Sequence, residues 1–228
     1  MIEIFLDTAN LKDIKKYTEW GIIKGVTTNQ KIFSKEKGCD FEERSRKILE
    51  IMDPYPVSLE GPNDYQGIID FAEKVEQWGS NAVVKVPMMG NGDGLRALHM
   101  IKDIVKTNVT ACIVPNQAFL AASAGATYVS MFYGRIRDYY THEQAMNFIR
   151  DTINTIKDSD TKLIIGSVRD AIDVQYMVPI QPDVITIPPK ILDRMPFHRR
   201  TEETLVEFEQ AWEDFLTLSK PELAKSKA

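Results

Sequence analysis

The sequence is poor in the residues that hold metals or form cross-links. It contains two cysteines, Cys39 and Cys112, and three histidines, His99, His142 and His198, among its 228 residues. The cysteines lie in unrelated contexts and the histidines are scattered along the chain, so no set has the spacing of metal ligands. We therefore expect reduced thiols, no disulfide framework and no metal site.

Long apolar runs and an excess of basic charge are also missing. The apolar runs are shorter than a membrane span, and the segment Met1 to Asp7 lacks the basic start and the cleavage site of a signal peptide. With 28 basic and 33 acidic side chains, the net charge of −5 does not favour a nucleic-acid partner. We expect a cytoplasmic protein that binds neither membranes nor nucleic acid.

No linker rich in proline, glycine or serine divides the chain, so we expect one domain over residues 1–218. Residues 219–228 contain three lysines and are expected to form a flexible tail. The glycine-rich segment Gly90–Gly94 lacks the Gly-Lys-Ser/Thr ending of a P-loop, and no acidic partner follows at dinucleotide spacing. We interpret it as a loop near Lys85 rather than a nucleotide site.

Apolar, β-branched stretches recur along the chain with helical patterns between them. This strict alternation favours a (β/α)8 barrel, the α/β fold called a TIM barrel, over a doubly wound open sheet, which more often stops at about five or six strands. The eight predicted strands are Ile2–Leu6, Ile22–Thr28, Pro56–Leu59, Ala82–Val86, Val109–Val114, Tyr128–Phe132, Leu163–Gly166 and Val184–Ile187.

Lys85 is the most unusual residue, because it stands in the run Ala82–Pro87, which is otherwise apolar and rich in valine. Such a run is typical of a strand covered on both faces, where an ammonium group is costly. Burial disfavours the charged form of an amine and so prepares a lysine for nucleophilic attack, as a Schiff base requires. The alternative is that Lys85 extends from a strand end into solvent.

Polar side chains close seven of the eight predicted strands. In a parallel barrel the carboxyl ends of the strands open onto one face, where active sites of this fold lie. Turn and cap roles account for Thr8, Asn10 and Asp170. They do not account for an acid, an amine and two guanidinium groups together, which indicate a pocket for an anionic substrate. The strand-end residues are Asp7, Thr27, Thr28, Asn29, Glu60, Lys85, Thr110, Ser130, Arg135, Ser167 and Arg169.

Five segments form an ordered set of motifs: Phe5–Asn10, Gly25–Asn29, Val83–Met88, Thr107–Thr110 and Ala124–Ser130. As a set they resemble the transaldolase family, and in particular its small-subunit branch of microbial transaldolases and fructose-6-phosphate aldolases. The resemblance implies a (β/α)8 barrel, a class I mechanism without metal or cofactor, and sugar-phosphate substrates. It also implies a ring-shaped homo-oligomer, a pentamer or a decamer of two pentamers.

The resemblance also implies roles for individual residues. Lys85 matches the lysine that forms an imine with a ketose phosphate, Asp7 matches the proton-transfer acid/base, and Glu60 with Thr110 matches the pair that holds the catalytic water. Arg135, Ser167 and Arg169 match the phosphate site, and Asn29 and Ser130 match groups that bind the dihydroxyacetone part. The complete predicted substrate site is Thr27, Asn29, Ser130, Phe132, Arg135, Ser167 and Arg169.

Two positions favour a transaldolase over an aldolase that releases free dihydroxyacetone. The aldolase branch typically has Gln where Glu60 stands and Tyr where Phe132 stands. A tyrosine hydroxyl there can help protonate the intermediate, whereas Phe leaves the carbanion waiting for an aldehyde acceptor. An alternative of another class is a silent sugar-phosphate binding protein, which would have no need of the Glu60–Thr110 pair.

Other positions depart from the family pattern. Gln30 replaces a usual Pro, Met131 stands where Pro usually separates Ser and Phe, and Ala111–Pro115 replaces a Phe-Ser-rich strand end. These departures leave the acceptor sugar open. They make a specialised sugar pathway an alternative to the pentose phosphate route.

The segment Thr201–Leu218 is expected to form an amphipathic C-terminal helix, because apolar residues recur at helical spacing among glutamates. Such a helix could fold back on its own barrel. The family resemblance implies instead that it reaches a neighbouring subunit. The apolar residues are Leu205, Phe208, Trp212, Phe215 and Leu216.

Overall fold

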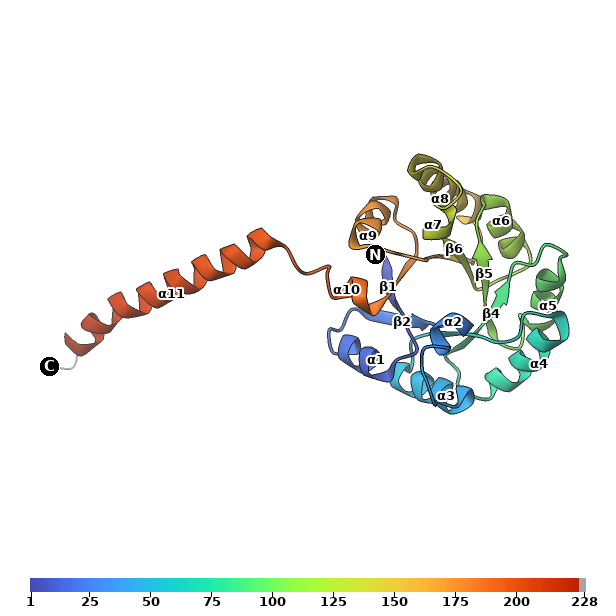
Figure 1. Ribbon diagram of the computed structural model, residues 1–228, viewed down its shortest axis with the longest axis horizontal. Coiled ribbons are helices and arrows are strands. Elements are labelled where there is room, and N and C mark those ends of the chain that lie inside the picture. Colours follow the sequence, from blue (N-terminus) through green and yellow to red (C-terminus); the bar gives the residue numbers. More distant parts are fainter. Residues whose placement is uncertain (226–228) are drawn as a thin grey trace. The chain divides into compact units, whose positions relative to one another are not determined.

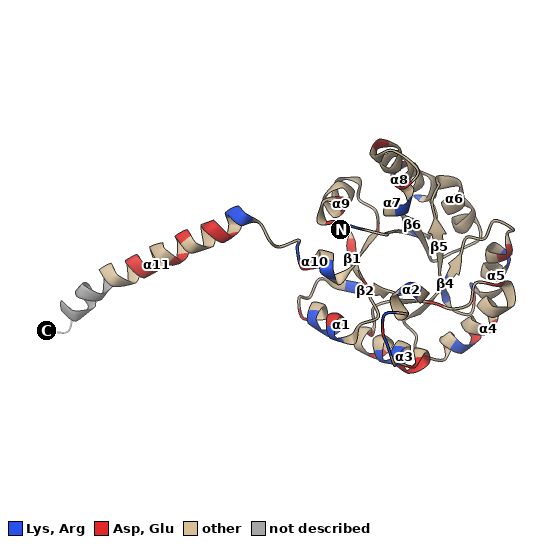
Figure 2. Cartoon of the chain, viewed as in Figure 1, with Lys and Arg blue, Asp and Glu red and all other residues tan. Residues whose placement is uncertain are grey.

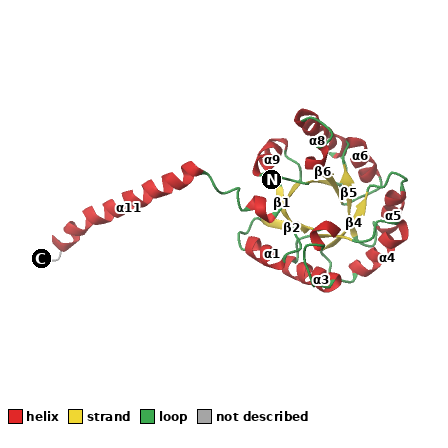
Figure 3. Cartoon of the chain, in the orientation of Figure 1, coloured by secondary structure: helices red, strands yellow, loops and turns green. Residues whose placement is uncertain are grey.

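The computed structural model describes the backbone of residues 1–225 and the side chains of residues 1–218. Its centre is a closed barrel of parallel strands in the order β1 to β8, with helices around it (Figures 1 and 3). The strands are β1 Glu3–Asp7, β2 Ile23–Thr27, β3 Val57–Glu60, β4 Ala82–Pro87, β5 Lys106–Cys112, β6 Tyr128–Phe132, β7 Lys162–Gly166 and β8 Val184–Ile187. The predicted (β/α)8 barrel is therefore confirmed, and the open sheet is wrong.

Helices follow the strands around the barrel. Asn10 caps α1 as predicted, since its Oδ1 accepts from the backbone N–H groups of Lys12 and Asp13 at 2.9 and 3.2 Å. No helix in the described part of the chain is long and apolar enough to cross a bilayer. The helices are α1 Leu11–Thr18, α2 Gln30–Phe33, α3 Phe41–Met52, α4 Tyr65–Glu76, α5 Asp93–Ile101, α6 Pro115–Ser123, α7 Tyr133–Ile136, α8 His142–Ile156, α9 Ala171–Met177, the short 3-10 helix η1 Val178–Ile180, α10 Pro189–Leu192 and α11 Arg199–Lys225.

The fifth strand is the one whose predicted bounds differ most. β5 begins at Lys106 rather than Val109 and ends at Cys112 rather than Val114. Its first residues are polar, so the apolar pattern missed them, although they pair in register with β4. This extension brings Asn108 into the sheet, opposite Lys85.

The barrel interior is built in layers. An apolar layer consists of Phe5, Val83, Tyr128, Ile164 and Val184, which form one buried cluster. Side chains two residues apart on a strand face the same side, so the next inward positions form a second layer closer to the carboxyl ends. That polar layer consists of Asp7, Lys85, Ser130, Gly166 and Thr186.

Gly25 makes room for the apolar layer. A Cβ at this position would lie 2.6 Å from the ring of Phe5, which is fully buried. The Gly-Val-Thr-Thr-Asn motif therefore begins with glycine for a packing reason.

The chain divides into two compact units, Met1–Ile191 and a second one from Leu192 onward. The second unit contains α11, so the predicted C-terminal helix is confirmed. Acidic residues recur along α11 (Figure 2), and its apolar side chains are exposed, with Trp212 at 60% and Phe208 at 65%. The backbone of α11 continues to Lys225, and residues 226–228 lie outside the described residues, so the flexible tail stays a prediction.

Candidate active site

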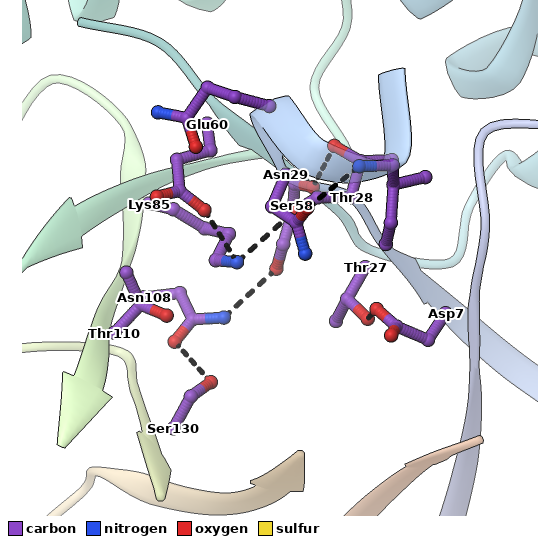
Figure 4. Close-up of polar contacts among 12 residues, drawn as sticks. Asp7, Thr27, Thr28, Asn29, Ser58, Glu60, Lys85, Asn108, Thr110 and Ser130 are labelled. Atoms are coloured by element: carbon purple, nitrogen blue, oxygen red, sulfur yellow. Dashed lines mark hydrogen bonds and ion pairs between the residues drawn. The ribbon is translucent and has the colours of Figure 1, made fainter. Parts of the chain in front are cut away.

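Lys85 is buried inside the barrel. It is 5% exposed, and its Nζ lies 2.8 Å from Glu60 Oε2 and donates to the Thr28 carbonyl oxygen at 3.0 Å (Figure 4). β3 and β4 are paired so that Glu60 and Lys85 are direct neighbours. The alternative that Lys85 extends into solvent is therefore wrong, because the strand directs its amine inward onto a carboxylate.

A cavity of about 180 Å³ lies at the carboxyl ends of the strands. It brings together eight of the predicted site residues from five strands and the segments that follow them. Glu60 reaches this group through its contact with Lys85, whereas Thr110 and Arg169 do not line the cavity. The lining residues are Asp7, Thr27, Asn29, Lys31, Ile32, Lys35, Lys85, Ser130, Phe132, Arg135, Gly166, Ser167 and Thr186.

Asp7 ends β1 and accepts a hydrogen bond from the Thr27 hydroxyl at 2.8 Å (Figure 4). Burial raises the pKa of Asp7 above its ordinary value, and the hydrogen bond from Thr27 and the positive charge of Lys85 oppose this rise only in part. A carboxyl group with a raised pKa can take up and return a proton closer to neutral pH. Asp7 is therefore suited to acid–base chemistry.

Asn29 combines a structural contact with a place in the cavity wall. It is the N-cap of α2, and its Oδ1 accepts from the backbone N–H of Ile32 at 2.8 Å. Its side chain also lines the cavity. Asn29 thus begins a short helix and lines the same cavity as Lys85.

Asn108 is a site residue that the sequence pattern missed. It is fully buried, its Oδ1 accepts from the Ser130 hydroxyl at 2.7 Å, and its Nδ2 donates to Ser58 Oγ at 3.2 Å (Figure 4). These bonds hold the amide beside Lys85 and orient Ser130. The sequence does contain a signal for it, since Asn108 stands in the motif Thr107–Thr110.

The backbone is strained where β5 and β7 end. Ala111 and Ser167 have φ values of 63° and 59°, in the left-handed region that non-glycine residues rarely adopt. Pairing between β5 and β6 shifts between Val109 and Cys112, so Ala111 lies at a bulge. Beside it, the Thr110 hydroxyl is buried without a hydrogen-bond partner among the described residues. Such features gather at functional sites.

The two predicted phosphate arginines are placed differently. Arg135 lines the cavity, with its guanidinium 5.0 Å from the centre of the Phe132 ring. Arg169 instead donates two hydrogen bonds of 2.6 Å to the carboxylate of Asp138. Arg135 and Ser167 thus face the cavity, whereas a contact of Arg169 with substrate stays a prediction.

The described residues include no group of three or more His, Cys, Asp or Glu side chains placed to hold a metal ion. Both cysteines are free thiols, Cys39 partly exposed and Cys112 buried. The cavity itself presents the amine of Lys85, the carboxylate of Asp7, hydroxyl groups and further cations.

Comparisons with known proteins agree with this geometry. Residues 4–226 match the family model described as transaldolase/fructose-6-phosphate aldolase. The "Probable transaldolase" of Nitrosopumilus maritimus is 41% identical over 219 residues, which cover 93% of this chain and 95% of the relative. That of Thermoplasma acidophilum is 41% identical over 218 residues, 92% of this chain and 95% of the relative.

Among solved structures, the deoxyribose phosphate aldolase from Aeropyrum pernix has a TM-score of 0.58 at 14% identity, over 86% of this chain and 89% of that one. At this identity the likeness concerns the fold alone. The resemblance in the motifs is confirmed by the family match and the relatives. The chain is therefore an enzyme of the transaldolase/fructose-6-phosphate aldolase family.

Proposed function

We propose that the protein is a transaldolase, which transfers a dihydroxyacetone unit from a ketose phosphate to an aldose phosphate through a Schiff base on Lys85. Fructose 6-phosphate and sedoheptulose 7-phosphate are the proposed donors. The observation that carries this proposal is the buried Lys85 amine, 2.8 Å from Glu60 in a cavity that Asp7 also lines. A nucleophile, a proton acceptor beside it and a second acid/base are the groups that this reaction requires.

The first half of the reaction forms the imine and cleaves the sugar. The Lys85 amine adds to the C2 carbonyl of the ketose, and the carbinolamine loses water, which Glu60 and Thr110 are proposed to hold. Asp7 then takes the proton of the C4 hydroxyl while the C3–C4 bond breaks. Its electron pair moves into the imine, so that an enamine stays on Lys85 and an aldose phosphate leaves.

The second half runs in reverse on another aldehyde. The enamine carbon attacks the acceptor carbonyl, and Asp7 returns the proton to the new hydroxyl group. Water then adds to the imine and releases the product ketose. Arg135 and Ser167 are proposed to hold the phosphate, and Asn29 and Ser130 the three-carbon unit, so that the reacting atoms stay aligned.

Phe132 supports transfer rather than release of free dihydroxyacetone. Its side chain lines the cavity and carries no hydroxyl that could protonate the enamine. The intermediate is therefore left for an aldehyde acceptor. The aldolase reaction remains the second candidate, because both activities occur under the family description.

Trapping of the imine tests the covalent step. Reduction with borohydride in the presence of fructose 6-phosphate should add a sugar-derived mass to Lys85, which peptide mass spectrometry can locate. Lys24 is a matched control, since this strand lysine donates to the Tyr55 hydroxyl at 3.0 Å outside the cavity. Labelling of a Lys85→Met variant, or loss of activity on addition of EDTA, would contradict the mechanism.

An exchange assay tests transfer. The enzyme is incubated with fructose 6-phosphate, with and without erythrose 4-phosphate. We expect sedoheptulose 7-phosphate and glyceraldehyde 3-phosphate only when the acceptor is present. Release of free dihydroxyacetone at the same rate without acceptor would make the protein an aldolase, and absence of both products would leave the silent binding protein.

We also propose that residues 1–218 act as one functional domain in a cytoplasmic homo-oligomer of at least five chains. The exposed apolar side chains of α11 support an assembly, since a stripe that includes Leu205, Phe208 and Trp212 gains stability when another surface covers it. Deletion from Thr201 onward should give smaller species in light scattering. A full-length chain that is monomeric at micromolar concentration would refute the proposal.

A further inference from the structure

Two cavity lysines, Lys31 and Lys35, have no role in the reaction derived above. Lys31 belongs to α2, and Lys35 lies in the turn that follows. Both are exposed, and both line the cavity with Asp7 and Lys85. Lys35 is close enough to Asp7 for its positive charge to oppose the rise in the pKa of that carboxyl group.

The cavity has a surplus of positive charge. Asp7 is the one acidic residue among its lining residues, against Lys31, Lys35, Lys85 and Arg135. Lys85 is neutralised by Glu60, but no carboxylate in the described part of the chain forms an ion pair with Lys31, Lys35 or Arg135. A concave site with more cations than carboxylates in its lining attracts an anion.

The topology separates these cations into two groups. In the closed barrel, β2 and β6 lie opposite each other, with three strands between them in either direction. Lys31 and Lys35 follow β2, whereas Arg135 follows β6. The two groups therefore approach the cavity from opposite sides.

Gln30 holds the lysine-bearing segment in place. Its Nε2 donates to the Gly61 carbonyl oxygen at 2.8 Å and to Asn63 Oδ1 at 3.1 Å. These bonds tie the start of α2 to the loop that follows Glu60. Proline, the usual residue of the family at position 30, could not form these hydrogen bonds because it has no side-chain donor.

We propose that Lys31 and Lys35 form a second oxyanion subsite opposite Arg135, which binds a sugar phosphate group that Arg135 does not hold. Ammonium groups bind phosphate as point charges, and two on one short segment can share its oxygens. The phosphate belongs either to the other end of a ketose bisphosphate or to the second sugar of the transfer. The inference rests on the proposed function for its substrates but not for its first test.

Binding of inorganic phosphate, measured by calorimetry at low ionic strength, tests the subsite without turnover. An Arg135→Gln variant should still bind phosphate, and adding Lys31→Gln and Lys35→Gln should weaken that binding by about tenfold. Lys37→Gln is the matched control, because Lys37 is exposed on the same segment and does not line the cavity. Complete loss in Arg135→Gln alone, or no effect of the two lysine changes, would overturn the proposal.

Three sugars then identify the source of the phosphate. If the two lysine changes weaken only the binding of fructose 1,6-bisphosphate, the subsite holds the phosphate at the C1 end of a ketose bisphosphate. If they raise only the KM for erythrose 4-phosphate, the subsite holds the phosphate of the second sugar. Fructose 6-phosphate serves as the reference sugar. If neither the affinity for fructose 1,6-bisphosphate nor the KM for erythrose 4-phosphate changes, the subsite proposal is contradicted. If the enzyme shows no transfer activity but still binds phosphate through the two lysines, only the proposed function is overturned.

Gln30 is a positioning residue in this scheme. In the Arg135→Gln background, Gln30→Met should weaken phosphate binding by about threefold while thermal stability stays close to that of the parent. Gln66→Met is its control, since Gln66 Nε2 makes a comparable exposed bond to Asp70 Oδ1 at 2.7 Å. Equal effects of the two changes on phosphate binding would remove Gln30 from the scheme.

Discussion

Two layers inside one barrel differ in every chemical respect although they are two residues apart. Phe5, Val83 and Ile164 fill the lower layer with apolar side chains that are fully buried. On the same strands and faces, Asp7, Lys85 and Gly166 form part of the layer above and line the cavity. The period of two along a strand thus separates residues that hold the barrel together from residues that perform chemistry.

The difference shows where the fold gains and loses stability. Burial of the apolar layer stabilises the barrel without directional demands. The polar layer needs specific partners, such as Glu60 for Lys85 and Thr27 for Asp7, and still leaves Asp7 in an environment that disfavours its charge. Five substitutions test this division.

The largest effect is expected for Lys85→Met in the polar layer. Without the amine no imine can form, so kcat for transfer should fall on the order of 10⁴-fold or more. Steady-state release of glyceraldehyde 3-phosphate measures it. The far-UV spectrum should stay that of the wild type, and Lys24→Met should keep its activity.

Ile164→Ala in the apolar layer should have the opposite signature. Loss of this fully buried side chain should lower the free energy of unfolding by about 2–5 kcal/mol, because it removes apolar contacts and leaves a cavity. Urea unfolding measures the loss. At a temperature where the variant is folded, kcat should stay within about twofold of the wild type; a parallel fall in kcat would show that the layers are not separable.

Arg135→Ala and Arg169→Ala sharpen the comparison at the rim of the cavity. Arg135→Ala should lower kcat/KM for fructose 6-phosphate by a factor that corresponds to about 2 kcal/mol of transition-state stabilisation, because it removes the proposed charge-assisted contact to phosphate. Arg169→Ala should lower it less, since this guanidinium is already paired with Asp138. Equal effects of the two changes, or equal kinetics on fructose and its phosphate, would count against this assignment.

The smallest expected change in stability is a gain. Asp7→Asn should abolish acid–base function but raise stability at pH 7 by about 1 kcal/mol, because it removes a disfavoured charge. The pKa of Asp7 in the folded protein lies above its ordinary value of 3.8. The destabilisation by its buried charge is therefore absent below pH 3.8 and complete above the pKa of the folded protein. The advantage of the variant should therefore grow as pH rises from about 4. Thermal unfolding between pH 4 and 8 checks this, and an advantage that shrinks with pH would contradict it.

Much of the fold and of the site could be predicted from the sequence. The alternation of apolar strands with helices identifies the barrel, and strand ends such as Asp7 and Lys85 mark the cavity because parallel strands open onto one face. The amphipathic pattern of α11 was sufficient for a helix. These features depend on local periodicity, which the sequence displays directly.

The features that were missed depend on partners far apart in the chain. Asn108 follows two polar residues, so the start of β5 carried no strand signal. In the sequence, Lys31 and Lys35 stand in an ordinary polar segment. Only the closed barrel places them beside the cavity. The pairing of Arg169 with Asp138 joins residues 31 positions apart, and only the folded chain brings them together.

The two left-handed residues at the strand ends matter for attempts to make a hardier catalyst. Glycine adopts such a backbone without strain, so both Ala111→Gly and Ser167→Gly would attract a library selected for heat resistance. Backbone strain favours the two changes equally, but the two side chains differ in what they contact. Ala111 contributes only a methyl group, whereas Ser167 presents its side chain to the cavity. Selection for heat resistance alone would therefore enrich one change outside the cavity lining together with one that removes the proposed phosphate contact of Ser167.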